Sequence, residues 1–371
     1  MKLRGARVSP ITLRFARPVR TARGVFTERP CVILELHDAD GVSGYGEAAP
    51  WAGFGMETLA ESLATLRQAA PLLCDADLEP GEWPVRLAAH FHSAPAARAA
   101  LDGALWDLAS RRAGRPLANL LAARVGPLSG AVLTQVPASA LLLERAPDAL
   151  FAEAANTRAA GYLAAKLKLG EDTLAEDLAR VGAARDGLGP DVALRGDANG
   201  AWSERQAREA LAALAPFRLA YVEQPVAATE IDAFARLRRD GTVRIAADES
   251  VTTAAGALRL LAADAVDVMV LKPACLGGPA RALEIAARAR RAGCEVVFTH
   301  AFESAVGATH ALHCAAAWGD AAAVHGIATR GLFVHDVAVP PACNGGRVVL
   351  SREPGLGISV PDLPEAGGSS A

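Results

Sequence analysis

The strongest constraint on the fold is a repeated alternation, over residues 126–330, of short apolar stretches with helical segments rich in Ala, Leu and Arg. Eight stretches are candidate strands: AVLTQV, YLAAKLKL, VALRGD, LAYVEQ, VRIAAD, VDVMVLK, EVVFTH and AAVHGI. Strands that alternate with helices pair in parallel, and eight such units close into a barrel rather than an open sheet. The sequence therefore predicts an α/β fold built on a (β/α)8 barrel.

The flanking regions have a different pattern. Residues 1–125 contain the alternating stretch CVILEL, the turn-rich GVSGYGEAAPWAGFG and the helical AARAALDGALWDLASRRAG, which together indicate an α+β domain with an antiparallel sheet. Residues 331–371 contain the hairpin-like GGRVVLSREPGLGISV and end in EAGGSSA, a composition typical of disorder. We expect the ordered part of residues 331–371 to return to the first domain and complete its sheet.

Composition limits the classes of partner. A net charge of −3, with 51% hydrophobic and 21% charged residues, lacks the excess of positive charge that binds nucleic acid. The six cysteines form no CxxC pair and no regular framework, so we expect reduced core thiols. No signal peptide and no apolar run of membrane-spanning length is found, so the cytoplasm is the expected location and no membrane partner is expected.

Five polar residues lie near the C-terminal ends of successive predicted strands: Lys168, Asp197, Glu223, Asp248 and Lys272. Their separations of 29, 26, 25 and 24 residues each match about one β/α unit. This register places all five at one mouth, the C-terminal face on which barrel enzymes build their sites.

The three carboxylates indicate a metal site. Burying Asp197, Glu223 and Asp248 together is costly unless a cation compensates them. Oxygen ligands favour Mg²⁺, with Mn²⁺ as the alternative ion, and disfavour zinc. The competing interpretation, that each acid caps the following helix, explains one acid more easily than three in register.

The lysines indicate acid–base chemistry. Lys166 and Lys168 are two residues apart on a strand, so both face the barrel interior, where two ammonium groups near a cation depress each other's pKa and make one a base. Lys272 faces them from the opposite side. The alternative interpretation of Lys166 and Lys168 is a solvated pair on an outer surface, and that of Lys272 is an ordinary lysine at a strand end. A small-molecule carboxylate chelated by the metal would lose its α-proton to give an enediolate. No GxxxxGK[ST], GxGxxG or GxSxG motif supports phosphoryl transfer, nicotinamide binding or serine hydrolysis.

These motifs resemble the enolase superfamily, and within it the muconate-lactonizing-enzyme subgroup. The resemblance rests on AAKLKLG, RGDANGAW, YVEQP, ADES and LKPACLGG, and on ALDGALWDLASRRAGRPL, which is similar to the end of the family's capping domain. It implies a capping domain over residues 1–125, completed by 331–371, and a catalytic barrel over 126–330. It also implies Mg²⁺ held by the three acids and a lysine base.

Within that subgroup, LKPACLGGPARALEIA, FTHAFESAVGATHALHCAAA and HGIATRGLFVHDVA look most like o-succinylbenzoate synthase, a lyase of menaquinone biosynthesis. The resemblance implies that Lys168 takes the α-proton of a cyclohexadiene carboxylate and helps the neighbouring hydroxyl leave as water. Lys272 would stabilise the enediolate as a cation, and Lys166 would tune Lys168. Capping-domain loops near Thr21 to Arg29 and Ala48 to Phe54 would close over the succinyl arm.

Other activities stay open. N-acylamino-acid racemases and dipeptide epimerases of the superfamily use the same two lysines as alternating bases, but an epimerase often has an acidic DxD in its eighth strand, and HGIATRGLF has none. A Schiff-base aldolase would leave the acids unexplained, and a non-catalytic binding barrel would be expected to lose ring residues. The resemblance also raises the prospect of a homo-oligomer, for which the sequence has no interface signature.

Further residues are candidates for substrate binding. Arg195 either binds a second carboxylate or packs, Asn199 follows the metal ligand Asp197, and His300 is either a proton shuttle or a hydrogen-bonded wall residue. Phe302, with Trp51 and Phe54, either lines the cavity around a substrate ring or packs in the core.

Overall fold

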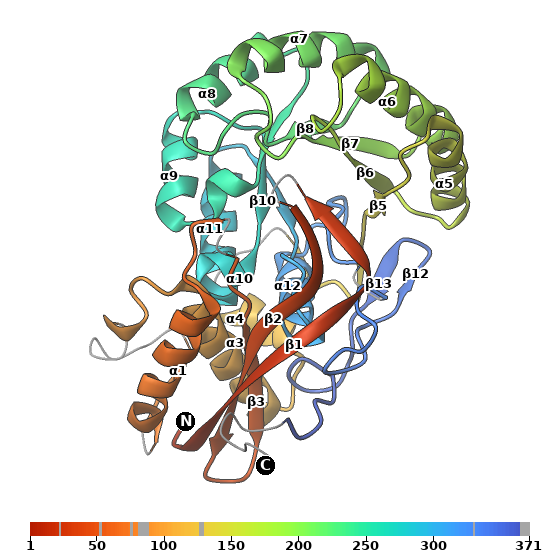
Figure 1. The fold of residues 1–371 in the computed structure, drawn as a ribbon. Coiled ribbons are helices and arrows are strands. Elements are labelled where there is room, and N and C mark those ends of the chain that lie inside the picture. The colour runs from red at the N-terminus through yellow and green to blue at the C-terminus, as the bar shows by residue number, and fades with distance from the viewer. Residues whose placement is uncertain are drawn as a thin grey trace.

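The computed structural model describes residues 1–21, 24–51, 54–74, 77–80, 89–125, 130–328 and 331–363. It consists of a barrel of parallel strands and outer helices, and of a second part with an antiparallel sheet that lies against the barrel (Figure 1). The α/β barrel with an α+β capping domain is the fold that the sequence predicts.

The barrel contains a curled sheet of seven parallel strands in the order β11-β10-β9-β8-β7-β6-β5. Their bounds are β5 Ala140–Leu142, β6 Ala164–Lys168, β7 Ala193–Asp197, β8 Tyr221–Glu223, β9 Ile245–Ala247, β10 Val268–Leu271 and β11 Glu295–Phe298. The ring is closed by single bridges: Ser139 N–H donates to His325 O at 2.8 Å, and Gly326 N–H donates to Phe298 O at 2.9 Å.

Two of the eight predicted strands are therefore wrong in detail. In AAVHGI, only His325 and Gly326 form bridges to the neighbouring segments, and no continuous strand ladder is present there. AVLTQV does not enter the parallel sheet, whose first strand is β5, further along the chain. Instead β4 (Gln135–Pro137) overlaps its end and pairs with a C-terminal hairpin.

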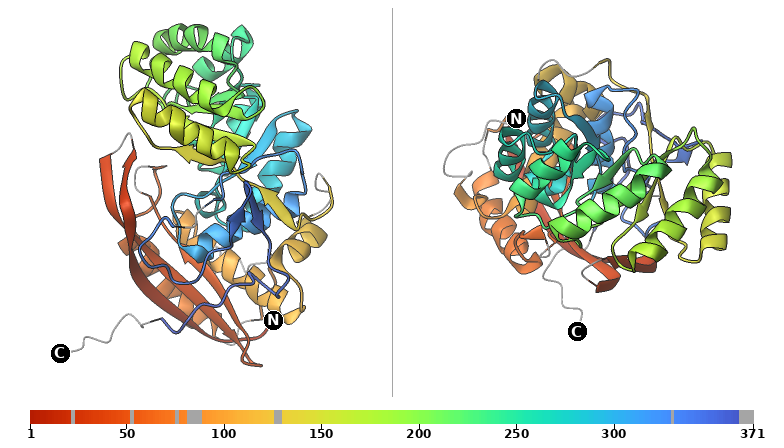
Figure 2. Two further views of the ribbon diagram at one scale, coloured as in Figure 1. Left: turned by 90° about the vertical axis from the view of Figure 1, so that its right-hand side faces the viewer. Right: turned by 90° about the horizontal axis from the view of Figure 1, so that it is seen from above.

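Helices cover the outside of the barrel. Those between residues 147 and 262 form the arc in Figure 1, and Figure 2 shows the molecule from two further sides. The helices of the barrel are α5 Pro147–Ala159, α6 Leu174–Leu188, α7 Glu204–Leu214, α8 Ile231–Asp240, α9 Ala254–Ala262, α10 Pro273–Leu276, α11 Pro279–Arg291 and α12 Ala305–Trp318, with the 3₁₀ turns η2 Ala215–Phe217 and η3 Glu249–Val251. Capping boxes start α6 at Thr173 and α7 at Ser203, where the side chain of the third helical residue bonds back to the cap backbone. Each such start fixes where a strand-end loop stops.

The described residues of the capping part include three antiparallel strands in the order β1-β2-β3 and the helices α1, α3 and α4. Their bounds are β1 Leu3–Thr21, β2 Gly24–Asp38, β3 Ser43–Ala48, α1 Leu59–Leu73, α3 Pro95–Arg112 and α4 Leu117–Val125. The predicted strand CVILEL lies in β2, and the predicted helix over residues 96–114 is α3. The turn-rich stretch contains β3, because its glycines let the strand lie directly on α3: a Cβ at Gly46 would be 1.9 Å from Ala100 O.

The C-terminal segment runs back along the capping part. Ala16 N–H donates to Leu332 O, and Val334 N–H donates to Arg14 O. The predicted hairpin is present as β12 Cys343–Asn344 and β13 Arg347–Val349, but it pairs with β4 instead of completing the β1-β2-β3 sheet. The β pairing of this C-terminal segment with β1 in the described residues is the single bridge between Phe15 and Phe333, and an ion pair between Arg7 and Asp362 adds a second contact. EAGGSSA lies outside them, and the domain limits 1–125, 126–330 and 331–371 stay a prediction.

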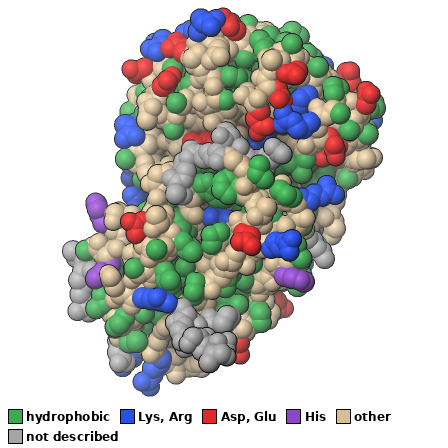
Figure 3. Space-filling model, viewed as in Figure 1, with side chains coloured by type: hydrophobic (Ala, Val, Ile, Leu, Met, Phe, Trp, Pro, Cys, Tyr) green, Lys and Arg blue, Asp and Glu red, His purple; other side chains and the backbone are tan. Residues whose placement is uncertain are grey.

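The surface carries mixed charge. Acidic and basic side chains are interspersed over the barrel helices on the face shown in Figure 3. All six cysteines are free, but the prediction that they lie in the core is wrong for two of them, because Cys74 is exposed and Cys343 is half-buried. Within the described ranges, no helix combines the length and apolarity needed to cross a membrane.

Candidate active site

A cavity of about 490 Å³ lies between the C-terminal ends of the barrel strands and the capping part. The residues predicted from the sequence that line it are Lys166, Lys168, Asn199, Asp248, Lys272, His300, Phe302, Trp51 and Phe54. Asp197 and Glu223 lie directly behind this surface and are fully buried. Arg195 is the one predicted site residue whose side chain neither lines the cavity nor belongs to the predicted metal ligands.

The floor of the cavity alternates acids with lysines. Strand register aligns Lys168 with Asp197 and Asp197 with Glu223 on three neighbouring strands. Lys168 Nζ donates to Asp197 Oδ2 at 2.7 Å, while Lys166 Nζ donates to the same oxygen at 2.8 Å and to Glu223 Oε1 at 3.0 Å. Lys272, four strands away from β6, forms a buried ion pair with Asp248. Lys168 and Lys272 therefore face each other across the floor.

Burial leaves one carboxylate poorly compensated. Desolvation, and then the charge of Asp197, raise the pKa of Glu223 to about 8. Desolvation acts in the same direction on Asp197, but Lys166 and Lys168 outweigh it and hold that pKa well below its usual range. A cation beside Glu223 would stabilise its ionised form.

The donor set fits a hard divalent cation. Asp197, Glu223 and Asp248 offer only oxygen, the ligand that Mg²⁺ and Mn²⁺ prefer. The neighbouring Glu249 adds a buried oxygen, Oε2, that has no hydrogen-bond partner. In the described part of the chain, no group of three or more acidic, His or Cys side chains is arranged to hold a metal ion as it stands: Asp248 is engaged by Lys272, and the other two acids share Lys166.

The lysine pKa values differ from the prediction. Burial lowers the pKa of Lys166, but the charges of Asp197, Glu223 and Asp248 outweigh it and raise that pKa well above its ordinary value. Lys272 likewise has a raised pKa, because its burial is outweighed first by Asp248. The expectation that two neighbouring ammonium groups lower each other's pKa left out these acids, which contact Lys166 directly.

Left-handed backbone at the strand ends shapes the floor. Asn199 has a φ of 46° and Gln224 a φ of 45°, a region that residues other than glycine adopt rarely and mostly at functional sites. Asn199 accepts from Lys168 Nζ at 2.6 Å and donates to Glu249 Oε1 at 3.0 Å. Fully buried Gln224 accepts from the backbone N–H of Asp248 at 3.1 Å. Sequence reasoning did not assign Gln224 or Glu249, although each is the residue directly after a predicted ligand.

Arg195 lies one layer below the cavity. Its Nη1 donates to Val324 O at 2.9 Å, and its guanidinium lies 5.0 Å from the centre of the Tyr221 ring. Of the two predicted roles, binding a second carboxylate or packing, this geometry corresponds to packing.

Aromatic side chains from both parts form one wall. Trp51 lies 6.2 Å from Phe54 and 5.8 Å from Phe302 between ring centres, and Phe54 lies 5.3 Å from Lys272 Nζ. These contacts correspond to the predicted apolar lining.

Buried Arg29 ties the two sides of this wall together. It donates to Ala49 O at 2.6 Å and Pro50 O at 2.8 Å in the capping part, and to Ala301 O at 3.2 Å and Phe302 O at 3.3 Å in the barrel. The sequence marked Arg29 only as the end of a loop. Its part as a link between two loops could not be inferred, because its partners are backbone carbonyls far away in sequence. Residues 22–23 and 52–53 of the two predicted closing loops lie outside the described residues.

Leucines from β5 form a second apolar wall. Leu141 is paired with Lys166 in register, so Leu141 and Leu143 face the cavity with the lysines, and they are 41% and 61% exposed. They were missed because the first barrel strand was expected at residues 131–136.

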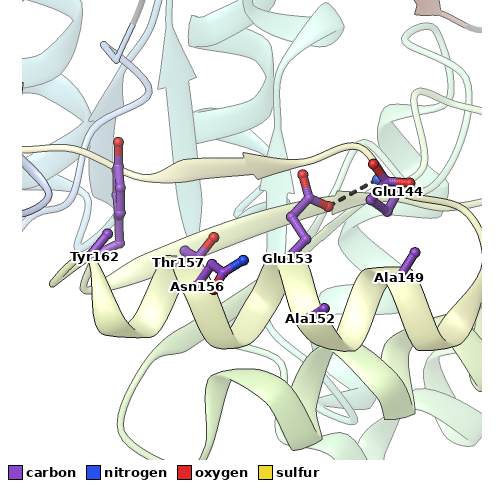
Figure 4. A pocket seen from close by; sticks show the side chains of 8 residues that line it. Glu144, Ala149, Ala152, Glu153, Asn156, Thr157 and Tyr162 are labelled. Carbon is purple, nitrogen blue, oxygen red and sulfur yellow. Dashed lines mark hydrogen bonds between the residues drawn. The ribbon is translucent and has the colours of Figure 1, made fainter.

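A second hollow is lined by side chains of α5, by Glu144 just after β5 and by Tyr162 (Figure 4). Its Glu153 accepts from the backbone N–H groups of Leu143 at 2.9 Å and Glu144 at 3.0 Å. This carboxylate fixes the end of β5 and thus supports the leucine wall from outside.

Comparison with known proteins gives two family matches. The family described as "Mandelate racemase / muconate lactonizing enzyme, N-terminal domain" matches residues 5–122, and "Enolase C-terminal domain-like" matches residues 149–363. A hydrophobic dipeptide epimerase of Enterococcus faecalis is 32% identical over 364 residues, which cover 97% of this chain and all of that protein. An o-succinylbenzoate synthase of Mycolicibacterium smegmatis is 40% identical over 245 residues, which cover 64% of this chain and 72% of that protein.

Solved structures are similar over the whole chain. The N-succinyl Arg/Lys racemase of Bacillus cereus has a TM-score of 0.87 at 25% identity and covers 97% of this chain and 96% of its own. The Enterococcus faecalis epimerase, solved with Mg and the dipeptide L-Leu-L-Tyr, has a TM-score of 0.86 at 29% identity and covers 97% and 100%.

Proposed function

The chain belongs to the enolase superfamily, and we propose that within it this protein is an o-succinylbenzoate synthase-like dehydratase that removes a proton α to a carboxylate and then eliminates water. The observation that carries the proton abstraction is the pair of lysines, Lys168 and Lys272, on opposite sides of a floor of buried carboxylates. The elimination rests on the motifs of the barrel and on the apolar walls.

The residues divide the work by position. Asp197, Glu223 and Asp248 would hold Mg²⁺, or Mn²⁺, which when bound would take up charge that develops on the substrate carboxylate. Lys168 Nζ would accept the α-proton and return it to the departing hydroxyl. Lys272 would remain an ammonium group on the other face, for which its raised pKa suits it. Lys166 donates to both Asp197 and Glu223. It would hold the Asp197 carboxylate in the place where it positions Lys168.

The site favours a substrate without an ammonium group. The described part of the segment that closes the barrel, residues 325–328, carries no carboxylate. The next acid along the chain, Asp336, is occupied by the backbone N–H groups of Ala305 at 2.9 Å and Val337 at 2.7 Å. At this end of the barrel a free amine would therefore lack the acidic partner expected of a dipeptide epimerase, and the glutamates that line the cavity, Glu144, Glu171 and Glu249, lie on other segments.

Racemisation of N-acylamino acids is the second candidate. The observation that favours it is the same opposition of Lys168 and Lys272, because a base on each face can remove and return the α-proton. An N-acylated amine carries no charge, so the missing carboxylate does not oppose this activity.

A side-by-side rate measurement tests the proposal. We expect the Mg²⁺-loaded protein to dehydrate the cyclohexadiene substrate, followed by absorbance, faster than it racemises N-succinylamino acids, followed by exchange of the α-proton in D₂O. Chelation of divalent ions should stop both. If only racemisation occurs, the dehydratase proposal is wrong but α-proton abstraction by this site still holds. If no substrate exchanges its α-proton, both the dehydratase proposal and α-proton abstraction are refuted.

A further inference from the structure

His300 has a ring whose proton position is fixed by the backbone. Phe302 N–H donates to His300 Nδ1 at 3.1 Å. A backbone N–H can only donate, so Nδ1 must present a lone pair, and the proton of the neutral ring must be on Nε2. Glu303 Oε2, 3.6 Å from Nδ1, is already occupied by the N–H of Ala301 at 2.6 Å.

The ring is held in the neutral form. Burial, and then the charges of Lys272 and Lys166, lower the pKa of His300 to about 3. Its donor is therefore the same across the physiological pH range, and it is not a proton shuttle in this state.

The loop that carries the ring is preorganised. Phe302 has a φ of 59°, which costs free energy for a bulky residue and persists only where surrounding contacts enforce it. Those contacts come from Arg29, which donates to the carbonyls of Ala301 and Phe302. The His300 ring is thus positioned by both parts of the molecule.

Nε2–H is directed to the substrate side. His300 lines the cavity, and no described residue accepts a hydrogen bond from its Nε2. The ring lies at the border between the charged floor around Lys272 and the aromatic wall, 6.3 Å from the Phe302 ring between centres. A substrate oxygen at this place would lie beside the floor of acids and lysines without contacting it.

We propose that His300 Nε2–H donates a hydrogen bond to a neutral carbonyl of the substrate whose carbon is two bonds from the reacting carbon, and thereby selects substrates that carry one. The proposal rests on the proposed function, in which the substrate carries a succinyl ketone. Anionic oxygens are better served by the lysines, whereas a neutral donor suits an acceptor that neither gains nor loses a proton. The amide carbonyl of an N-acylamino acid would occupy the same donor.

The test compares two ligands that differ by one oxygen. Binding of o-succinylbenzoate and of its analogue with the ketone replaced by methylene is measured by calorimetry, with Mg²⁺ present, on wild type, His300→Gln and His300→Phe. We expect wild type to prefer the ketone about tenfold, as one neutral hydrogen bond allows. His300→Gln, which keeps a donor, should retain most of this preference, and His300→Phe should lose it. The wild-type preference should be equal at pH 6 and pH 8.

The outcomes separate the two proposals. Wild-type protein that binds both ligands equally overturns the role of His300 without any variant, so a variant that fails to fold does not obscure the result. A preference that survives in folded His300→Phe overturns it as well. Wild type that binds neither ligand overturns the proposed function itself.

Discussion

Replacing Lys166 by Met tests whether the carboxylate floor needs its cations. The ammonium group of Lys166 is the shared donor for Asp197 and Glu223, whose side chains are 0% and 1% exposed. Removing one member of a buried ion pair costs roughly 3–5 kcal/mol because the remaining charge is left uncompensated. The Lys166 side chain is itself 25% exposed, so we take the lower end, about 3 kcal/mol.

The assay is thermal unfolding in chelator and in excess Mg²⁺. Unfolding entropy is about 2.1 cal/mol/K per residue, so 3 kcal/mol over 371 residues corresponds to a fall in Tm of about 4 °C in chelator. A divalent ion beside the same acids should restore part of this loss. The Tm gain on adding Mg²⁺ should therefore be larger for Lys166→Met than for wild type.

Lys2→Met is the matched control, because Lys2 is exposed and far along the chain from the floor. It should leave the response of the Tm to Mg²⁺ unchanged. If Lys166→Met melts within 1 °C of wild type in chelator, the acids are not held by this lysine. If its response to Mg²⁺ equals that of wild type, the ion does not bind at these acids.

Two further substitutions probe the contacts around the aromatic wall. Burial, and then the charge of Glu47, raise the pKa of Glu303 to about 7 from an ordinary 4.5. Between these pH values the folded state retains a proton that the unfolded chain has lost, so the free energy of unfolding of wild type falls as pH rises from 4.5 to 7. Glu303→Gln, which resembles the protonated acid, should gain stability relative to wild type by about 2 kcal/mol between pH 5 and pH 7.5 in urea unfolding, and a constant difference would contradict this cause. Arg29→Met should raise KM more than it lowers kcat, since the wall of Trp51 and Phe302 loses its link; lowered stability with unchanged KM would assign Arg29 a structural role alone.

The sequence predicted the parts of the site that depend on the repeat. Lys168, Asp197 and Glu223 fall into register because one β/α unit separates them, and parallel pairing converts equal spacing into neighbouring positions. The period also predicted that Lys272 faces Lys168. Such inferences need only the number of residues per unit.

Features that depend on single backbone contacts were not predictable in the same way. The first barrel strand is β5 and not residues 131–136, because both stretches are short and apolar and only pairing with β6 distinguishes them. The closing segment at His325 forms bridges without a ladder, which apolar patterning does not reveal. Arg29 acts through carbonyl oxygens, which every residue has, so no side-chain pattern marks its partners.

Lysines and arginines have different roles in this chain. Of 38 Lys and Arg residues, only four are lysines, and three of these meet on the cavity floor. Buried arginines instead hold backbone carbonyls: Arg29 links two loops, and Arg180 donates to Lys168 O at 3.0 Å. An arginine suits such clamping because its guanidinium is a planar fork that stays charged, whereas a lysine can release its proton and act as a base.

Lys168→Arg should therefore preserve the cation beside Asp197, and with it the stability, while abolishing exchange of the substrate α-proton. Lys168→Ala should lose the same activity and differ only in stability, because it also removes the charge. General-base catalysis contributes about 10²–10⁴-fold, so a loss of that size is expected for both variants. Exchange in D₂O, followed by NMR with Mg²⁺ present, measures it. Lys168→Arg protein that keeps more than about a tenth of wild-type exchange would show that position 168 supplies charge and not a base, and the α-proton would then have to leave toward Lys272.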